Sequence, residues 1–339
     1  MKRKFLRSAT AALALAALGA MAATSSAQAQ VQERTFKLGL QNPKGHPLEQ
    51  GAAKFAEIVA AKSGGKIKVN VFPGGTLGGD QQTVSALQGG TVEITVLNSG
   101  ILASQVKDFE VFDFPFMFAT AKEADTVVDG PFGQKLHAKL GDKGIVGLAY
   151  WELGFRNLTN GRRPINTVED IAGLKLRVIP NAINVDWVKA LGANPTPMAF
   201  PEVYAGLESK AIDGQENPLS VILANKFAEV QKHLAVTNHQ YNPQSFIFSK
   251  KVWEGLSADE KKIVGDAAAE AGRFQRQVNR AAAASQLEQL KKAGMQVTEL
   301  NAAEQAKLRA KLAPVIDKHG AAISATVAEL QAELAKLRK

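Results

Sequence analysis

The residues best suited to chemistry lie between Leu174 and Pro218. The run LKLRV predicts a short strand with Arg177 near its carboxyl end, followed by a helix, a Pro-rich turn and a second helix opened by Pro201. The segment ends on a predicted polar tip, Asp213–Pro218, with the sequence DGQENP. Because an arginine fork donates two parallel hydrogen bonds to a carboxylate, this pattern indicates a site for a small organic acid.

The orientation of Arg177 has two interpretations. In the predicted strand, Leu174, Leu176 and Val178 face one side, and Arg177 faces the other. A solvated arginine on an edge strand explains this alternation as well as a ligand contact does. Ligands of open α/β sheets bind beyond the carboxyl ends of the strands, which is where Arg177 falls.

Four further residues occupy positions at or near predicted loops. Arg156 directly follows a predicted buried strand, and a surface salt bridge explains it as well as a ligand contact. Asn217 either serves a ligand or caps a turn. Asn98 follows the predicted strand 93–97 and belongs either to a polar loop or to the wall of a site. Phe200 is of a type that packs in a core more often than against a ligand.

No motif for catalysis or metal binding can be placed in the sequence. It contains no GxSxG, no HExxH and no Ser-x-x-Lys set that can be assigned to a site. The Gly-rich run 74–79 lacks the Lys-Ser/Thr ending of a phosphate-binding loop and predicts a tight turn before a helix at Asp80. The five histidines show no metal-ligand spacing, and His46, in the loop after the first strand, is the one predicted near a cleft.

The first 29 residues are predicted to be an export signal. A basic start precedes an apolar run from Ala9 to Ala23, and Ala27-Gln28-Ala29 gives a small-x-small cleavage pattern. The apolar run is shorter and richer in alanine than the roughly 20 strongly apolar residues of a membrane anchor. The mature protein is expected to begin near Gln30 and to be periplasmic, without stable insertion into a membrane.

Charge and cysteine content exclude several classes of protein. The formal net charge is +9, and four of the 41 basic residues but no acidic residue lie in the export signal, which leaves +5 for the mature chain. The basic residues are spread along the chain without an arginine-rich arm, so nucleic acid is not an expected partner. The chain has no cysteine, which excludes thiol catalysis, cysteine–zinc sites and disulfide staples.

Strand and helix signals alternate along the mature chain, which predicts an α/β fold with a mainly parallel sheet. A chain of about 310 residues exceeds one hydrophobic core and predicts two domains. The runs Val84–Val96 and Tyr204–Gln215 both end a helix on a small residue before a strand, as two similarly wound lobes would. Strands are predicted at about 35–40, 66–72, 93–97, 144–150, 174–179 and 244–249.

The C-terminal third is predicted to be helical. Ser257 and Glu260 form a capping box, and the segment from Ala258 to about Lys292 contains no proline. A single helix over this segment would be about 50 Å long, which is long enough to cross both domains. A second capped helix follows Asn301, and residues 321–339 form an amphipathic helix.

Several motifs in the same order make the mature chain resemble a known family. GLKLRV, GANPTPMAFPEVY and AIDGQENP resemble the substrate-binding proteins of tripartite ATP-independent periplasmic (TRAP) transporters, the DctP-like family. Gly45-His46-Pro47, FPGGTLGGD at 72–80, DFPFMF at 113–118 and GFRNLTN at 154–160 extend the resemblance over the mature chain.

The resemblance implies a periplasmic-binding-protein fold, in which two α/β lobes are joined by crossing strands and a long helix. Lobe I is then expected at residues 30–153 plus about 242–281, and lobe II at 154–241 plus about 282–339. It further implies a monomer that binds one organic acid in the cleft and docks in its closed form on an ion-driven membrane permease. No cofactor and no catalysis are expected.

The resemblance also assigns roles to residues. Arg177 matches the arginine that binds the carboxylate, Arg156 matches a supporting arginine, Asn217 an amide on the acid group, and Phe200 an aromatic wall. On the segment after the strand EITVL, sialate-binding members carry a Glu and an Arg where this chain has Asn98 and Ile101. A smaller and less polyhydroxylated acid than sialic acid is therefore expected.

The remaining candidates and rival functions stay open at this stage. Gln41, Asn42 and His46 are expected partners for hydroxyl or keto oxygens. Some family members bind 2-keto acids together with a cation, with which Glu216 is compatible. A sensor that passes a bound acid to a membrane receptor needs the same closing cleft. An exported enzyme acting on an acid is the weaker rival, because no nucleophile–base pair is found.

Overall fold

The computed structural model describes residues 31–338, so the predicted export signal at residues 1–29 lies outside the described part of the chain. The chain alternates strands and helices, as the sequence predicts. The strands are β1 (Arg34–Leu40), β2 (Ile67–Phe72), β3 (Ile94–Asn98), β4 (Ile145–Asn160), β5 (Lys175–Val178), β6 (Asn194–Pro197), β7 (Gly214–Asn217), β8 (His233–Ser249) and β9 (Gln296–Glu299).

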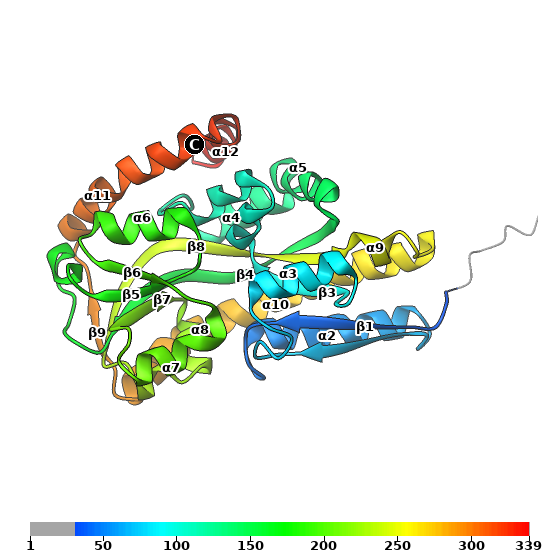
Figure 1. The fold of residues 1–339 in the computed structure, drawn as a ribbon, viewed down its shortest axis with the longest axis horizontal. Helices are drawn as coiled ribbons and strands as arrows, with labels where there is room; N and C mark the ends of the chain where they lie inside the picture. The colour runs from blue at the N-terminus through cyan, green and yellow to red at the C-terminus, as the bar shows by residue number, and fades with distance from the viewer. Residues whose placement is uncertain (1–30, 339) are drawn as a thin grey trace, which may run out of the picture.

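Helices cover both faces of the sheet (Figure 1). The α-helices are α2 (Pro47–Lys62), α3 (Asp80–Gly89), α4 (Ala121–Asp129), α5 (Pro131–Lys139), α6 (Ala182–Ala190), α7 (Val203–Glu208), α8 (Leu219–Ala224), α9 (Lys250–Trp253), α10 (Ala258–Lys292), α11 (Ala302–Ala321) and α12 (Ser324–Leu337). The short 3-10 helices are η1 (Ser99–Ser104), η2 (Lys107–Asp113), η3 (Leu140–Lys143), η4 (Val168–Ile171), η5 (Phe200–Glu202) and η6 (Phe227–Glu229).

The strands form one continuous sheet in the order β2-β1-β3-β8-β4-β7-β5-β6, with β9 paired to β8 outside this path. β1 is parallel to β2 and β3, and β5 is parallel to β6 and β7. We call the half built on β1–β3 lobe I and the half built on β5–β7 lobe II. Because β3 and β4 are both antiparallel to β8, and β7 is antiparallel to β4, the two parallel sets run in opposite directions. Their carboxyl ends therefore face each other.

The two longest strands, β4 and β8, connect the lobes. They pair antiparallel from Ile145 opposite Ser249 to Asn160 opposite His233, and the register shifts at three places. One shift ends at Gly154, whose φ of 110° is a conformation that residues with side chains rarely adopt. The predicted α/β class with two lobes and crossing strands is thus confirmed.

Helix α10 runs along both lobes, and its bounds agree with the predicted helix 258–292. It begins at the expected capping box, in which Glu260 N donates to Ser257 Oγ at 3.2 Å and Ser257 N donates to Glu260 Oε2 at 2.8 Å. Along its length α10 contacts α2 of lobe I and α8 of lobe II. The helix therefore links the two lobes in addition to the two long strands.

Two hydrophobic clusters lie on opposite faces of the sheet. Neighbouring residues of β8 alternate between them, with Ile247 in one cluster and Phe246 and Phe248 in the other. The first cluster includes side chains of α4, α5, α6, α11 and α12, and the second includes side chains of α2, α7, α8 and α10. Each cluster extends over both lobes, so the molecule has three layers.

The C-terminal helices contact both lobes. α11 packs on α6 of lobe II, whereas α12 contacts α4 and η2.

The lobe boundaries near residues 153, 241 and 281 stay a prediction. Within residues 31–338, no helix is both long and apolar enough to cross a membrane.

Two predicted connections are strands in the structure. The predicted Pro-rich turn contains β6, which pairs only with β5 at the edge of the sheet. An edge strand tolerates Pro195 and Pro197 because one side of its backbone needs no ladder partner. The predicted polar tip 213–218 contains β7, which is buried between β4 and β5. Its polar side chains bond to each other and to neighbouring strands, which explains how such a sequence is buried.

The crossing strands are also much longer than the apolar runs that predicted them, 144–150 and 244–249. Both strands continue through buried polar residues such as Glu152, Arg156, Gln240 and Asn242. These residues interrupt the apolar pattern, so the sequence gives no strand signal there.

The contact of α10 with β4 yields a first prediction. A Cβ on Gly272 would lie 2.7 Å from Cδ1 and Nε1 of the Trp151 indole, whose Nε1 donates to Ala268 O. We expect Gly272→Ala to lower the free energy of unfolding by about 1–3 kcal/mol through overpacking. Gly265→Ala is the matched control on the same helix, because no heavy atom lies within 4 Å of its Cβ position.

The control should raise the free energy of unfolding by about 0.5–1 kcal/mol, since alanine favours a helix over glycine. Urea denaturation of both variants measures the difference. Equal stabilisation by both substitutions would show that Gly272 does not pack against Trp151 as described.

Candidate functional site

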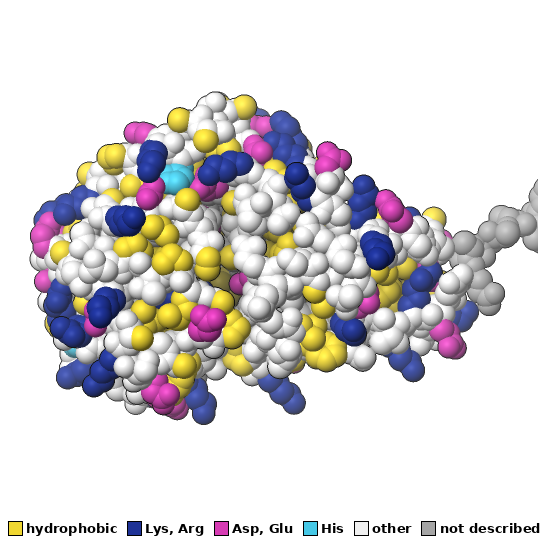
Figure 2. Space-filling view, viewed as in Figure 1, with side chains coloured by type: hydrophobic (Ala, Val, Ile, Leu, Met, Phe, Trp, Pro, Cys, Tyr) yellow, Lys and Arg dark blue, Asp and Glu magenta, His cyan; other side chains and the backbone are white. Residues whose placement is uncertain are grey.

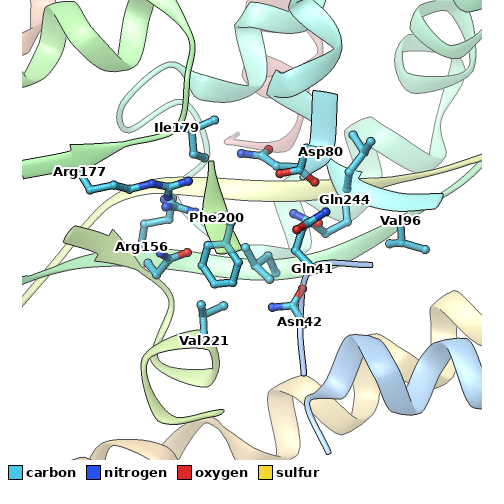
Figure 3. Close-up of a pocket in the computed structure, with 14 residues that line it drawn as sticks. Gln41, Asn42, Asp80, Val96, Arg156, Arg177, Ile179, Phe200, Val221 and Gln244 are labelled. Carbon is cyan, nitrogen blue, oxygen red and sulfur yellow. The ribbon is translucent and has the colours of Figure 1, made fainter. Parts of the chain in front are cut away.

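A cavity lies between the lobes at the carboxyl ends of their strands, where open α/β sheets bind ligands. Its volume is about 40 Å³, and a neighbouring cavity of about 310 Å³ shares Asp80, Arg177 and Phe200 with it. Figure 2 shows the surface hollowed between the lobes, beside α3. The lining comes from both lobes and both long strands and consists of Gln41, Asn42, Asp80, Val96, Leu97, Asn98, Leu153, Arg156, Arg177, Ile179, Phe200, Asn217, Val221 and Gln244 (Figure 3).

The lobes touch each other beside this cavity through the Gly-rich turn 74–79. The turn precedes α3 as predicted, and Gly75 has a φ of 69°. A Cβ on Gly75 would lie 2.9 Å from Pro201 Cγ of lobe II and 2.9 Å from Gln41 Oε1. Glycine is therefore required for the turn to approach lobe II this closely.

Arg177 is a buried arginine held in one orientation. Its side chain comes from β5, it is 2% exposed, and its Nε and Nη2 donate to Met198 O at 3.0 and 2.8 Å. The guanidinium carbon lies 5.7 Å from the centre of the Phe200 ring. Within residues 31–338, Arg177 forms no ion pair with a carboxylate. Burial, together with the charge of Arg156, lowers the pKa of Arg177 to about 10, so it stays charged at neutral pH.

Arg156, the second predicted arginine, is neutralised inside the protein. Its Nε and Nη2 pair with the Glu216 carboxylate, its Nη2 also donates to Glu216 O, and its Nη1 donates to Asn242 Oδ1 at 2.8 Å. Although burial favours protonation of Glu216, the charge of Arg156 and the His239 hydrogen bond hold its pKa at about 2. These bonds occupy four of the five N–H groups of Arg156, so the second arginine offers little to an anion.

The predicted amide residues lie at the ends of β3 and β7. Asn98 Oδ1 accepts from Gly100 N at 3.2 Å, and Asn98 Nδ2 donates to Asn242 Oδ1 at 3.4 Å. Asn217, which is 3% exposed, donates through Nδ2 to Gln215 Oε1 at 2.5 Å. Internal hydrogen bonds thus fix the orientation of both side chains at the cavity wall.

Two glutamines bring unpartnered polar atoms to the cavity. Gln41 Nε2 donates to Gly78 O at 3.0 Å, which leaves its Oε1 buried without a partner in the described chain. Gln244, on β8, is 3% exposed, and its Nε2 is likewise buried and unpartnered there. Because an unsatisfied buried polar atom is costly, one free acceptor and one free donor favour a ligand with polar oxygens.

Asp80 adds a carboxylate to the cavity from α3 of lobe I. It is the first residue of α3 and is half-buried. Desolvation raises the pKa of Asp80 to about 6, against the opposing charge of Arg177. The cavity therefore combines one fixed cation with one carboxyl whose ionisation is disfavoured.

His46 lies outside the cavity lining, unlike the other six residues predicted for the site. It is the N-cap of α2, and its Nδ1 accepts a hydrogen bond from Leu48 N at 3.1 Å. The side chain is 1% exposed, and burial lowers the pKa of His46 to about 3, so the ring is neutral. Helix capping, rather than contact with a ligand, accounts for this placement.

Asp80 and Gln244 are the polar lining residues that the sequence did not suggest. Asp80 directly follows the Gly-rich turn, where it reads as an ordinary first residue of a helix. Gln244 opens the apolar run 244–249, and this polar start of a buried strand is the signal that could have identified it.

A metal site was not among the expectations, apart from a cation near Glu216. Both carboxylate oxygens of Glu216 are engaged by Arg156. Among residues 31–338, no group of three or more His, Cys, Asp or Glu side chains is arranged to hold a metal ion. The expectation that no cofactor is needed stays a prediction, and a cation that accompanies a keto acid stays its open alternative.

Comparison with known proteins agrees with this architecture. The 2,3-diketo-L-gulonate-binding periplasmic protein YiaO of Escherichia coli (strain K12) is 37% identical over 86% of this chain and 88% of its own length. A solved TRAP periplasmic solute-binding protein from Ochrobactrum anthropi is 53% identical, with a TM-score of 0.80 over 91% of this chain and 96% of that one. The sugar acid-binding protein DctPAm of Advenella mimigardefordensis, solved with galactonate, is 43% identical, with a TM-score of 0.89 over 90% and 99% of the two chains.

A family match covers most of the chain. Residues 38–322 match the family described as bacterial extracellular solute-binding protein, family 7 (DctP). The match includes both lobes and every residue that lines the cavity. The chain therefore belongs to the DctP family, the solute-binding proteins of TRAP transporters.

Proposed function

We propose that this protein captures a monocarboxylate that carries hydroxyl or keto oxygens and delivers it to the membrane permease of a TRAP transporter. It acts as a periplasmic monomer, without catalysis and without a metal cofactor. A ligand sensor would use the same cleft, and genes for permease subunits beside this one would favour transport.

The buried guanidinium of Arg177 is the single observation that carries this proposal. A charge removed from water is costly unless an opposite charge or hydrogen bonds compensate it. Met198 O accepts two of its hydrogen bonds, but no carboxylate of the described chain pairs with it. A ligand carboxylate in the cavity would supply the missing charge and accept the remaining N–H groups.

The cavity charges favour one carboxylate over two. Arg156 is already neutralised by Glu216, so Arg177 is the cation left for a ligand in the lining. A second ligand carboxylate in this cavity would find no further unpaired cation in the lining, and Asp80 would repel it when both are ionised.

Hydroxyl and keto oxygens suit the remaining lining. The free Gln41 Oε1 accepts a hydrogen bond from a hydroxyl, and the free Gln244 Nε2 donates to a hydroxyl or a keto oxygen. Asn42 and Asn98 add further amides on the lobe I side. The names of two relatives support this class, since one is solved with galactonate and the other is named for 2,3-diketo-L-gulonate.

Closure of the lobes follows from where the contacts lie. Arg177, Phe200 and Asn217 belong to lobe II, whereas Gln41 and the turn 74–79 belong to lobe I. A ligand that touches both sets of groups makes more contacts when the lobes are closed. It therefore shifts the population toward the closed form, which the permease would recognise.

Replacement of Arg177 tests the proposed carboxylate contact. We expect Arg177→Ala to weaken binding of the acid by about 2–5 kcal/mol, because the carboxylate would lose its desolvated charge partner. This corresponds to an increase in Kd of about 30-fold to several thousand-fold. Arg177→Lys should also bind poorly, since a single ammonium does not reproduce the planar fork.

Isothermal titration calorimetry on the folded variants measures these affinities. Lys175→Ala is the matched control, because Lys175 is exposed on the same strand. Near-wild-type affinity of folded Arg177→Ala would refute the assignment.

A panel of acids tests the ligand class. We expect galactonate to raise the melting temperature of the protein clearly and succinate to raise it little, because of the Asp80 carboxylate. Binding to the folded state alone stabilises it by about 2.7 kcal/mol at a ligand concentration of 100 times Kd. The shift should survive EDTA. A larger shift with succinate would contradict the monocarboxylate assignment, and loss of the shift in EDTA would contradict binding without a metal.

Asp80 gives a prediction on stability in the absence of ligand. Because its pKa of about 6 exceeds the ordinary value of 3.8, the folded protein holds the Asp80 proton more tightly than the unfolded chain does. The contribution of Asp80 to stability therefore falls as the pH rises from about 4 to about 6. We expect Asp80→Asn to raise the melting temperature at pH 8 and to change it little at pH 4.

Asp108→Asn is the control with the opposite sign. Burial alone would raise the pKa of Asp108, but hydrogen bonds from Lys139 and Thr326 lower it below its ordinary value. Removal of the Asp108 carboxylate should therefore reduce stability at pH 8. Differential scanning calorimetry at both pH values measures the two effects. The same change at both pH values in Asp80→Asn would contradict the raised pKa.

A further inference from the structure

A buried carboxyl behind the cavity gathers four side-chain amides. Asp113, the last residue of η2, is 0% exposed. Its Oδ2 accepts from Asn181 Nδ2 at 2.6 Å and Asn184 Nδ2 at 3.0 Å, and its Oδ1 accepts from Gln240 Nε2 at 2.9 Å and Asn242 Nδ2 at 3.3 Å. Asp113 does not line the cavity, and it pairs with no Lys or Arg among residues 31–338.

Two of the amides come from the start of α6 in lobe II, and other donors fix their orientation. Ile183 N donates to Asn181 Oδ1 at 2.9 Å, and Trp187 Nε1 donates to Asn184 Oδ1 at 2.9 Å. Backbone N–H and indole N–H groups only donate, so the amide oxygens must face them. The Nδ2 groups consequently face Asp113, which has to accept both hydrogen bonds.

A third amide links Asp113 to the cavity wall. Asn242 Oδ1 accepts from Arg156 Nη1 at 2.8 Å and from Asn98 Nδ2 at 3.4 Å, which directs Asn242 Nδ2 to Asp113. Arg156 and Asn98 both line the cavity. Asn242 therefore supplies one of the hydrogen bonds that orient each of these two residues, and Asp113 in turn fixes the orientation of the Asn242 amide.

The same carboxyl holds the lobes together. Asn181 Nδ2 also lies 3.4 Å from Gly100 O, in η1 of lobe I. A Cβ on Gly100 would lie 2.1 Å from Asp113 Oδ2, so glycine permits the carboxyl to reach this position. Asp113 thus joins the segment after β3 to the first turn of α6 across the lobe boundary.

A neutral residue does not replace the carboxylate in this arrangement. An asparagine at position 113 has one acceptor oxygen and would turn its own N–H groups toward amide donors that are fixed in orientation. Burial raises the pKa of Asp113 to about 7, opposed by the charge of Arg156 and the Asn184 hydrogen bond and assisted by Glu216. The protein thus keeps a carboxyl where burial makes ionisation costly, and where its four acceptor positions are all used.

We propose that Asp113 is a positioning residue for ligand binding, which orients the cavity wall through Asn242 and docks α6 of lobe II on lobe I. This inference rests on the proposed function as a binding protein that closes around an acid. Asp113 does not touch the ligand. It acts by fixing Asn242, which hydrogen-bonds to Asn98 and Arg156, and by joining α6 to the segment after β3.

The test compares two variants with a matched control. Asp113→Asn preserves the shape of the side chain but lacks the second acceptor oxygen. Asn181→Ser keeps an oxygen that caps α6 but removes the amide that donates to Asp113. Asp108→Asn is the same substitution on the same short helix η2, at a side chain that pairs with Lys139 instead.

Calorimetry with galactonate measures affinity at constant pH. We expect Asp113→Asn to raise Kd by about 10-fold or more and Asn181→Ser by about 3-fold to 10-fold, because hydrogen bonds to a charged group are lost. Asp108→Asn should stay within about twofold of wild type. The double variant Asp113→Asn with Asn184→Asp, which returns a carboxylate to this contact, should recover part of the loss. Wild-type affinity in Asp113→Asn, or an equal loss in Asp108→Asn, overturns the proposal.

The distance between the lobes separates positioning from folding. The chain has no cysteine, so cysteines placed at the exposed Ser85 of α3 and Glu208 of α7 carry two spin labels. At a galactonate concentration that closes the wild type, Asp113→Asn and Asn181→Ser should retain a longer mean distance while still unfolding in a single cooperative transition. Wild-type distances in both variants overturn the inference, and Asn181→Ser decides the outcome where Asp113→Asn does not fold.

The two proposals fail in different ways. If the wild type binds no acid of the panel, the proposed function fails. The distance distribution of the ligand-free variants then tests Asp113 alone: a longer distance than in the wild type supports the contact between the lobes, and an unchanged distribution overturns it. If the wild type binds galactonate and the variants bind it equally well, only the role of Asp113 fails.

Discussion

The fixed charge of Arg177, which forms an ion pair with no carboxylate of residues 31–338, is the constraint on which the rest of the site depends. The two cavity arginines are both buried, yet their environments differ. Arg156 is neutralised by Glu216, whereas Arg177 has a backbone carbonyl as its acceptor. Burying an arginine without a counter-ion is unfavourable, and a bound anion offsets this cost. Part of the affinity for an anion therefore comes from removing the free-energy cost of the buried, unpaired Arg177 charge.

The fold positions this charge by directing two parallel sets of strands at one another. Their carboxyl ends bring Gln41 and Asn98 from lobe I opposite Arg177 and Asn217 from lobe II. The long strands β4 and β8 and helix α10 continue through both lobes, and the register of β4 and β8 shifts at three places, one of them at Gly154. Polar side chains fill the strands at the crossing, and Asp113, Asn242 and Arg156 hydrogen-bond there in place of apolar packing.

Much of the fold could be predicted from the sequence because local rules govern those elements. The alternation of strands and helices, the capping box at Ser257 and the bounds of α10 follow from periodicity and capping. The central parts of β4, β7 and β8 could not be predicted, because their polar residues are satisfied by partners far away in the chain. The polar sequence of Gly214–Asn217 is typical of a loop. It forms a buried strand because Glu216 pairs with Arg156 of a neighbouring strand.

The candidate site could also be predicted from the sequence only in part. Residues at strand ends, such as Arg177 and Asn217, were identified by position and by resemblance. The sequence alone could not distinguish the free arginine from the neutralised one, since the difference lies in a long-range ion pair. It also could not show that His46 turns into its helix to cap it, or that Asp80 and Gln244 turn toward the cavity.

A crystal structure of the protein with galactonate would show whether Arg177 binds the carboxylate. We expect the ligand to lie between the lobes, with its carboxylate within hydrogen-bonding distance of the Arg177 guanidinium and its hydroxyls near Gln41 and Gln244. A galactonate whose carboxylate is bound elsewhere, with Arg177 still donating to Met198 O alone, would contradict it.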